Sequence, residues 1–146
     1  MARRINHKGR REDKRYFGIP YSVTESINFI RMNATANKLL IDIGRQFYGC
    51  NNGDLCATYS EMQLRGWKSK DTLNDALAEL RHYGMIIETQ VGGLNLPSLY
   101  ALTWLKVDKA KKCSKAVVGQ VPGNWKLETT KFIRPSTLSR KKRKNG

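Results

Sequence analysis

The sequence lacks the long apolar runs that would define a membrane protein. No hydrophobic stretch approaches the ~20 residues that a membrane-spanning helix requires. The first residues, Met-Ala-Arg-Arg, do not form the apolar segment of a signal peptide. We therefore expect a cytoplasmic protein.

Cysteine and histidine are also scarce, which limits metal and redox chemistry. The cysteines are Cys50, Cys56 and Cys113, and an odd number does not make a disulfide framework, so we expect reduced thiols. Cys50 and Cys56 do not match a common zinc-ligand spacing with His82, and the other histidine is His7. The sequence has no phosphate-binding glycine loop and no nucleophile paired with a base in a known motif. We expect no cofactor, no metal and no enzymatic activity.

Acidic residues are few, and their shortage is confined to the ends of the chain. The 146 residues contain 27 Lys and Arg against 12 Asp and Glu, for a net charge of +15. Residues 1–32 carry +5, residues 33–105 carry −1 and residues 106–146 carry +11. A neutral centre between cationic arms suggests that the arms attract a polyanion while the centre decides the binding geometry.

The neutral centre contains the pattern of two short helices. The first is expected to begin at Thr58, whose hydroxyl can cap free amides while Glu61 reaches back, and to end at Gly66. The second is expected to open at Ser69 and close at Gly84. Its apolar residues recur at helical spacing and predict one buried stripe: Leu73, Ala76, Leu77 and Leu80.

A β-hairpin is expected directly after the second helix. Met85–Val91 and Ser98–Trp104 are rich in β-forming residues, and the Gly-Gly and Pro of residues 92–97 interrupt them. Aromatic residues near these boundaries are expected in the core rather than as stacking platforms: Trp67, Tyr83, Tyr100 and Trp104.

A longer helix and a short strand are expected before these elements. Asn33 is a candidate cap for a helix whose apolar residues fall at helical spacing: Ala36, Leu39, Leu40, Ile43 and Phe47. Asn51–Asp54 is a turn signal, and Leu55–Ala57 can pair with the hairpin. The order α, β, α, α, β, β predicts an α+β fold, a winged helix-turn-helix with a C-terminal β-hairpin wing.

Three regions follow from these patterns. We expect a basic disordered arm in residues 1–15, the winged-helix domain in residues 16–105 and a basic extended tail in residues 106–146. The tail is extended or disordered in this interpretation, with docking through Trp125 and Phe132 as one possibility.

The candidate nucleic-acid contacts are polar residues of the second helix, the hairpin and the arms. They are Lys68, Ser69, Lys70, Asn74, Arg81, Gln90, Asn95, Arg3, Arg4, Arg10, Arg11, Arg140, Lys141, Lys142, Arg143 and Lys144. In a major groove Asn74 can read adenine, and Lys70 or Arg81 can reach guanine or phosphate. Gln90 and Asn95 can enter a minor groove. An ordinary solvated helix face and hairpin tip would carry the same residue types.

A helical wheel places acidic residues opposite the buried stripe of the second helix. The face is centred on Asp71, Asp75 and Ala78, with Glu79 to one side. Asp71 is also explained by the helix dipole, and Asp75 and Glu79 by simple solvation. As a binding surface, the carboxylates Asp71, Asp75 and Glu79 would suit basic residues of a protein partner.

Several strings of this chain resemble small winged-helix proteins of bacterial prophages, plasmids and integrative elements. They are Asn51–Leu55, Arg65–Trp67, Leu73–Leu80 with Gly84, Thr89–Asn95 and Ser98–Trp104, and the resemblance covers about residues 8–105. Such proteins are similar to replication-initiation and regulatory winged helices. The resemblance implies double-stranded DNA, rather than RNA, as the ligand.

Two functions are therefore expected as alternatives. In the first, a mobile genetic element encodes a DNA-binding winged-helix protein that acts in transcription or replication control. In the second, the winged helix is a phage- or plasmid-encoded accessory subunit or inhibitor that docks on a host or defence nucleoprotein complex of CRISPR type. The acidic face would make the contact in the second case.

Overall fold

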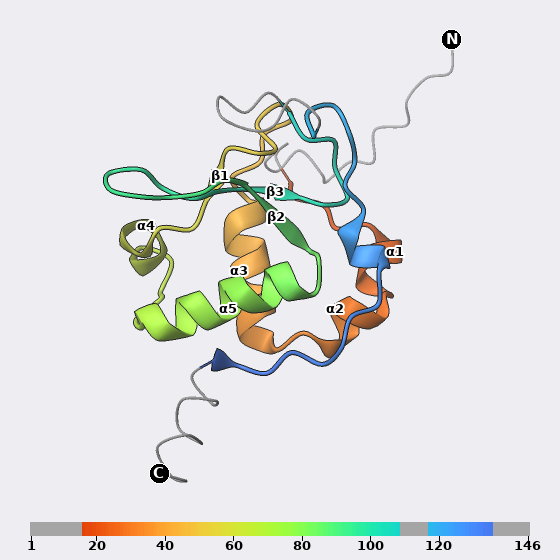
Figure 1. Cartoon of the computed structure of the whole chain (residues 1–146), viewed down its shortest axis with the longest axis horizontal. Helices are drawn as coiled ribbons and strands as arrows, with labels where there is room; N and C mark the ends of the chain where they lie inside the picture. Colours follow the sequence, from red (N-terminus) through yellow and green to blue (C-terminus); the bar gives the residue numbers. More distant parts are fainter. Residues whose placement is uncertain (1–15, 109–116, 136–146) are drawn as a thin grey trace, which may run out of the picture.

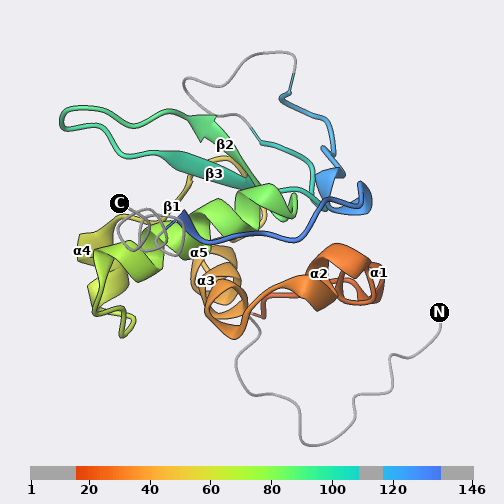
Figure 2. The ribbon, with the colours of Figure 1, turned by 60° about the horizontal axis from the view of Figure 1, so that its bottom comes forward.

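A group of helices packs against a small antiparallel sheet in the computed structural model, which describes residues 16–108 and 117–135 (Figures 1 and 2). The elements are α1 (Tyr21–Thr24), α2 (Ile27–Arg31), α3 (Ala34–Gly44), β1 (Leu55–Cys56), α4 (Tyr59–Gln63), α5 (Lys70–His82), β2 (Ile86–Gln90), β3 (Leu99–Leu102) and the 3-10 helix η1 (Asn124–Lys126). The α+β class is confirmed. The order from α3 to β3 is the one that the sequence predicts.

The sheet has the strand order β1-β3-β2, and both pairs are antiparallel. Leu55 pairs with Tyr100, so the expected short strand adds to the hairpin as predicted. Ile86 pairs with Leu102, and the register shifts by a bulge between Glu88 and Gln90. The β2–β3 hairpin projects beyond the helices in both views (Figures 1 and 2).

The core lies between α3, α5 and the sheet. The apolar stripes of both helices are buried as predicted: Ala36, Leu39, Leu40 and Ile43 on α3, and Leu73, Ala76, Leu77 and Leu80 on α5. Burying a Leu or Ile side chain typically contributes about 1.5–3 kcal/mol, so these two stripes supply much of the stability. Phe47 lies past the end of α3 and is partly buried against the same core. The four aromatic residues at element boundaries are buried as expected: Trp67, Tyr83, Tyr100 and Trp104.

The helix ends agree only in part with the capping signals. Ser69 caps α5 as expected, because its Oγ accepts a hydrogen bond from the Thr72 amide at 3.3 Å. Gly66 and Gly84 follow α4 and α5 with φ of +91° and +71°, conformations that favour glycine. Thr58 occupies the N-cap position of α4 as predicted. The predicted hydrogen bond from its side chain is wrong, because the Thr58 hydroxyl does not cap the helix.

Glu61, the expected partner of Thr58, is also engaged elsewhere. Its Oε2 accepts a hydrogen bond from Cys56 Sγ at 2.9 Å. Burial of Cys56, together with Glu61, raises the pKa of this thiol to about 11. The thiol is therefore protonated and unreactive at neutral pH.

The tail returns to the helices after residue 117, and we call residues 127–135 the strap. Gly123 donates to the Thr103 carbonyl at 2.8 Å, which fixes η1 beside the end of β3. Trp125 and Phe132 pack against the core, in the docked arrangement that the sequence allowed. In both views the strap leaves η1 and runs past α5 (Figures 1 and 2).

Within the described residues, no helix is long and apolar enough to cross a membrane. The longest, α5, has 13 residues and carries charged side chains on its exposed side.

A buried carboxylate ties α3 to the turn between α4 and α5. Asp42 is 3% exposed and accepts hydrogen bonds from Lys38 Nζ at 2.7 Å and Trp67 Nε1 at 2.8 Å. Arg65 Nε donates to its other oxygen at 3.1 Å. Burial by itself raises the pKa of Asp42, but the hydrogen bonds from Lys38, Trp67 and Arg65 outweigh it and hold the pKa below the ordinary value of 3.8. The turn that precedes α5 is thus fixed by one side chain.

We expect Asp42→Asn to lower the free energy of unfolding at pH 7 by about 1.5–3 kcal/mol, the usual range for hydrogen bonds to a charged group. Since the folded pKa of Asp42 is the lower one, its contribution is present above the unfolded value of 3.8 and is lost as the pH falls toward the folded pKa. Urea unfolding from pH 7 down to pH 3 measures this. The exposed Asp54→Asn variant is the control, and equal stability of the two variants at pH 7 would contradict the account.

Candidate nucleic-acid interface

The exposed side of α5 is less acidic than the helical wheel predicts. Lys70, Asp71, Thr72, Asn74 and Arg81 are exposed, whereas Asp75, Ala78 and His82 are half-buried and Glu79 is buried. The expectation that the most exposed line runs through Asp71, Asp75 and Ala78 is therefore wrong. Two cations and one amide share the exposed side with a single fully exposed carboxylate.

Glu79 lies in the interior between α5 and the start of α3. It is 2% exposed, and its Oε1 accepts a hydrogen bond from the Asn33 amide at 2.7 Å. Its Oε2 accepts from Asn33 Nδ2 at 3.2 Å. Asn33 occupies the N-cap position of α3 as expected, but its side chain binds Glu79 instead of capping the helix. Glu79 is thus unavailable to a protein partner.

The N-terminal half of α5 borders a shallow pocket beside the hairpin. The pocket has a volume of about 290 Å³ and is lined by Ala57, Thr58, Tyr59, Lys70, Leu73, Asn74, Leu77, Ser98 and Tyr100. Lys70 Nζ lies 5.5 Å from the centre of the Tyr59 ring, and the Tyr59 hydroxyl donates to the Lys68 carbonyl at 2.9 Å. Lys70 and Asn74 lie one helical turn apart and both line this pocket, so they are neighbours on the N-terminal half of α5.

Two other predicted contacts of this region, Arg81 and Ser69, already have partners in the fold. Arg81 Nη1 lies 3.2 Å from Glu88 Oε2 and links α5 to β2. Arg81 is exposed and Glu88 is half-buried at the surface, where ion pairs are usually worth about 1 kcal/mol or less, so a phosphate can displace Glu88. Ser69 uses its hydroxyl as the α5 cap, and its neighbour Lys68 is exposed.

The hairpin tip is ordered by its own hydrogen bonds. Gln90 Nε2 donates to the Pro97 carbonyl at 2.8 Å, so this amide is turned into the hairpin. Asn95 is exposed at the tip with φ of +56°. Leu94 beside it is 95% exposed, a feature that the sequence analysis missed because hydrophobicity alone places leucine in a core. Residues 85–105 contain no Lys or Arg, so the hairpin contributes no positive charge.

Most of the positive charge lies outside the described residues. The described residues contain 11 Lys and Arg and 10 Asp and Glu, whereas the other segments contain 16 and 2. The candidate contacts in those other segments are Arg3, Arg4, Arg10, Arg11, Arg140, Lys141, Lys142, Arg143 and Lys144, all outside the described residues. The folded part is nearly neutral, as the sequence predicts for the centre of the chain.

The described part of the chain contains no group of three or more His, Cys, Asp or Glu side chains able to hold a metal ion. The chain matches no protein-family model, no curated protein and no solved structure. The functional argument therefore depends on the surface of α5 and on the elements at its two sides.

We expect Glu79→Ala to destabilise the fold by about 1–3 kcal/mol, because the change removes the buried partner of the Asn33 amide. Asp71→Ala, on the exposed side of the same helix, should cost at most about 0.3–1 kcal/mol through the helix dipole. Thermal and urea unfolding of the two variants provide the comparison. A Glu79→Ala variant as stable as Asp71→Ala would place Glu79 on the surface after all.

Proposed function

We propose that the protein is a winged helix-turn-helix that binds double-stranded DNA, with α5 in the major groove and the β2–β3 hairpin as its wing. The observation that carries the proposal is the position of Lys70 and Asn74, exposed together on α5 beside the hairpin. An α-helix fits the major groove, where Asn can bind adenine through two hydrogen bonds and Lys can reach guanine or phosphate. The turn at Gly66 and the Ser69 cap give α4 and α5 the connection that a helix-turn-helix uses.

The resemblance to winged-helix proteins of mobile elements suggests the role. We infer that the protein acts in transcription or replication control of such an element. DNA is favoured over RNA because the deep, narrow major groove of duplex RNA does not admit a helix.

Two of the three carboxylates that would dock on a nucleoprotein complex in the alternative function are not available on the surface of α5. Glu79 is buried against Asn33, and Asp75 is half-buried and already has an interaction partner. Asp71 is the remaining exposed carboxylate of that set. A single exposed carboxylate is little basis for recognising a basic protein surface, so we favour DNA.

Lys70→Ala should weaken binding to every duplex sequence, because it removes a positive charge that attracts phosphates. Asn74→Ala should cost about 1–3 kcal/mol at the preferred site and relax the base preference there. Asp71→Asn should preserve or strengthen binding, because it removes a charge that repels phosphates. Fluorescence anisotropy with a mixed-sequence duplex, and with a duplex selected from it, measures all three.

The matched control is Lys126→Ala, an exposed lysine on η1 near the opposite end of α5. It changes the net charge as Lys70→Ala does. If the Lys70 and Asn74 variants bind DNA like the parent while the parent binds well, α5 is not the recognition helix.

Removal of residues 1–14 and 139–146 should weaken DNA binding and flatten its salt dependence, since each phosphate contact contributes about −0.9 to the slope of log K against log salt. The thermal transition should be nearly unchanged, because these segments lie outside the described fold. Titrations at several salt concentrations and calorimetry test both points. A truncated protein with the parent's salt slope would show that the arms do not contact phosphates.

A further inference from the structure

We propose that the strap is a second DNA-contacting edge of the protein, with Lys131 and Arg134 on the phosphate backbone at the side of α5 away from the hairpin. This inference rests on the proposed function. It assigns a role to two residues for which the sequence patterns gave none, and it explains why the tail is folded back along the helices.

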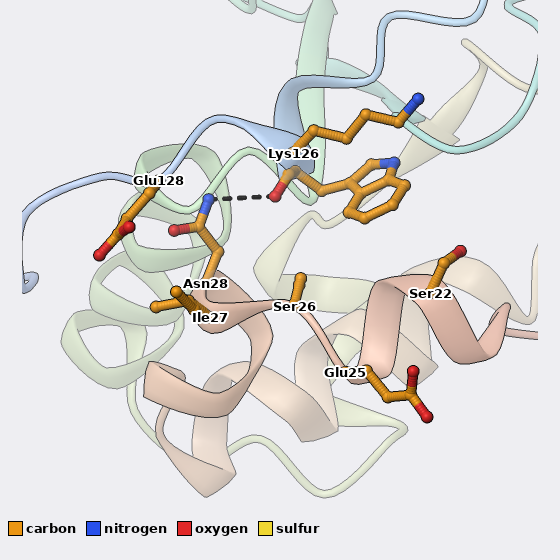
Figure 3. Close-up of a pocket in the computed structure, with 8 residues that line it drawn as sticks. Ser22, Glu25, Ser26, Ile27, Asn28, Lys126 and Glu128 are labelled. Atoms are coloured by element: carbon orange, nitrogen blue, oxygen red, sulfur yellow. Dashed lines mark hydrogen bonds between the residues drawn. The ribbon is translucent and has the colours of Figure 1, made fainter.

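The strap is held in place by a buried side chain of α2. Asn28 is 1% exposed, and its Nδ2 donates to the carbonyl of Trp125 at 3.2 Å (Figure 3). The same Nδ2 donates to the carbonyl of Leu127 at 2.7 Å. Its Oδ1 accepts from the Thr129 amide at 3.1 Å. An amide that satisfies this many backbone groups fixes the path of the segment, because losing it would leave buried polar groups unpaired.

Two side chains at the end of α5 hold the next part of the strap. His82 Nε2 forms a hydrogen bond with the carbonyl of Thr130. The Tyr83 hydroxyl accepts from the Phe132 amide at 3.0 Å, and the Phe132 ring lies 5.4 Å from the His82 ring. The strap therefore passes the C-terminal end of α5 at a fixed position.

The strap and the hairpin lie on different sides of α5. Arg81 is joined to Glu88 of the hairpin, whereas its neighbour His82 is joined to the strap. Consecutive residues of a helix point about 100° apart, so the two attachments face different directions. The stripe Asp75, Ala78 and His82 is half-buried, while Lys70, Asn74 and Arg81 stay exposed between it and the hairpin.

The charges of the strap fit a phosphate backbone. Phe132 is partly buried against the core, while Lys131 and Arg134 are exposed. Within residues 16–108 and 117–135, no carboxylate forms an ion pair with either cation, and the strap's Glu128 is paired with Arg31 at 3.0 Å. The sequence contains no Asp or Glu after Glu128.

The geometry of a major groove explains why cations are needed on this side. A helix in a groove about 12 Å wide has a phosphate backbone on each side. The hairpin side has Lys70 and Arg81, whereas the half-buried strap side of α5, with Asp75, Ala78 and His82, has no Lys or Arg. Lys131 and Arg134 supply positive charge on that side of the helix.

The test is the double variant Lys131→Gln with Arg134→Gln in the full chain. Loss of two phosphate contacts should reduce the magnitude of the slope of log K against log salt by about 1.8, at 0.9 for each contact. The matched control, Arg45→Gln with Lys106→Gln, removes one exposed arginine after α3 and one exposed lysine after β3, both outside the strap, and should leave the slope unchanged. Thermal unfolding verifies that both doubles keep the fold.

The outcomes separate this inference from the proposed function. If Lys70→Ala weakens DNA binding but the strap double has the parent's slope, the strap role is overturned and the DNA-binding function stands. An equal reduction of the salt slope in the strap double and in the control would mean that only net charge matters, which also overturns the strap role. A parent protein that does not bind duplex DNA would refute the function itself.

Discussion

The geometry of the proposed interface depends on the carboxylate of Asp42. This buried group on α3 accepts hydrogen bonds from Arg65 and Trp67, the residues that flank the glycine turn between α4 and α5. Because a buried carboxylate without partners is costly, the turn is held to α3 and the start of α5 is held with it. The other end of α5 is fixed by the hydrogen bond from the Asn33 amide to Glu79 and by Gly84, which follows the helix. The exposed side of α5 is thus rigidly placed before any ligand arrives.

The sequence predicted the α+β class, the hairpin and the buried stripes because these features come from local periodicity and turn residues. It did not predict the burial of Glu79. A helical wheel gives the direction in which a side chain points, but not which other element of the fold covers that side chain. The role of Asn28 was missed for a related reason: its partners lie 55 to 101 positions away in the sequence. Of the candidate site, Lys70 and Asn74 are exposed and adjacent to the hairpin as expected, whereas the cations of the strap carried no recognisable motif.

A nearly neutral fold with strongly basic segments suggests two kinds of contact in the proposed DNA binding, contacts to phosphates and contacts to bases. In the proposed function the basic segments would give affinity that depends on salt and little on sequence, since each phosphate contact releases counterions. The proposed base-reading residues need fixed positions, and α5 would supply them as a helix held at both ends. The strap combines the two, because it is cationic and anchored through Asn28 and Tyr83 at the same time.

The central claim is that duplex DNA contacts the exposed side of α5, between the hairpin and the strap. Nuclear magnetic resonance of the nitrogen-labelled full chain, titrated with duplex DNA, tests it most directly. The account predicts that the amide signals of Lys70, Asn74, Asn95 and Lys131 shift together with those of the basic segments, while Ile41 on the outside of α3 is unaffected. Shifts confined to residues 1–15 and 136–146, with α5 unchanged, would contradict it.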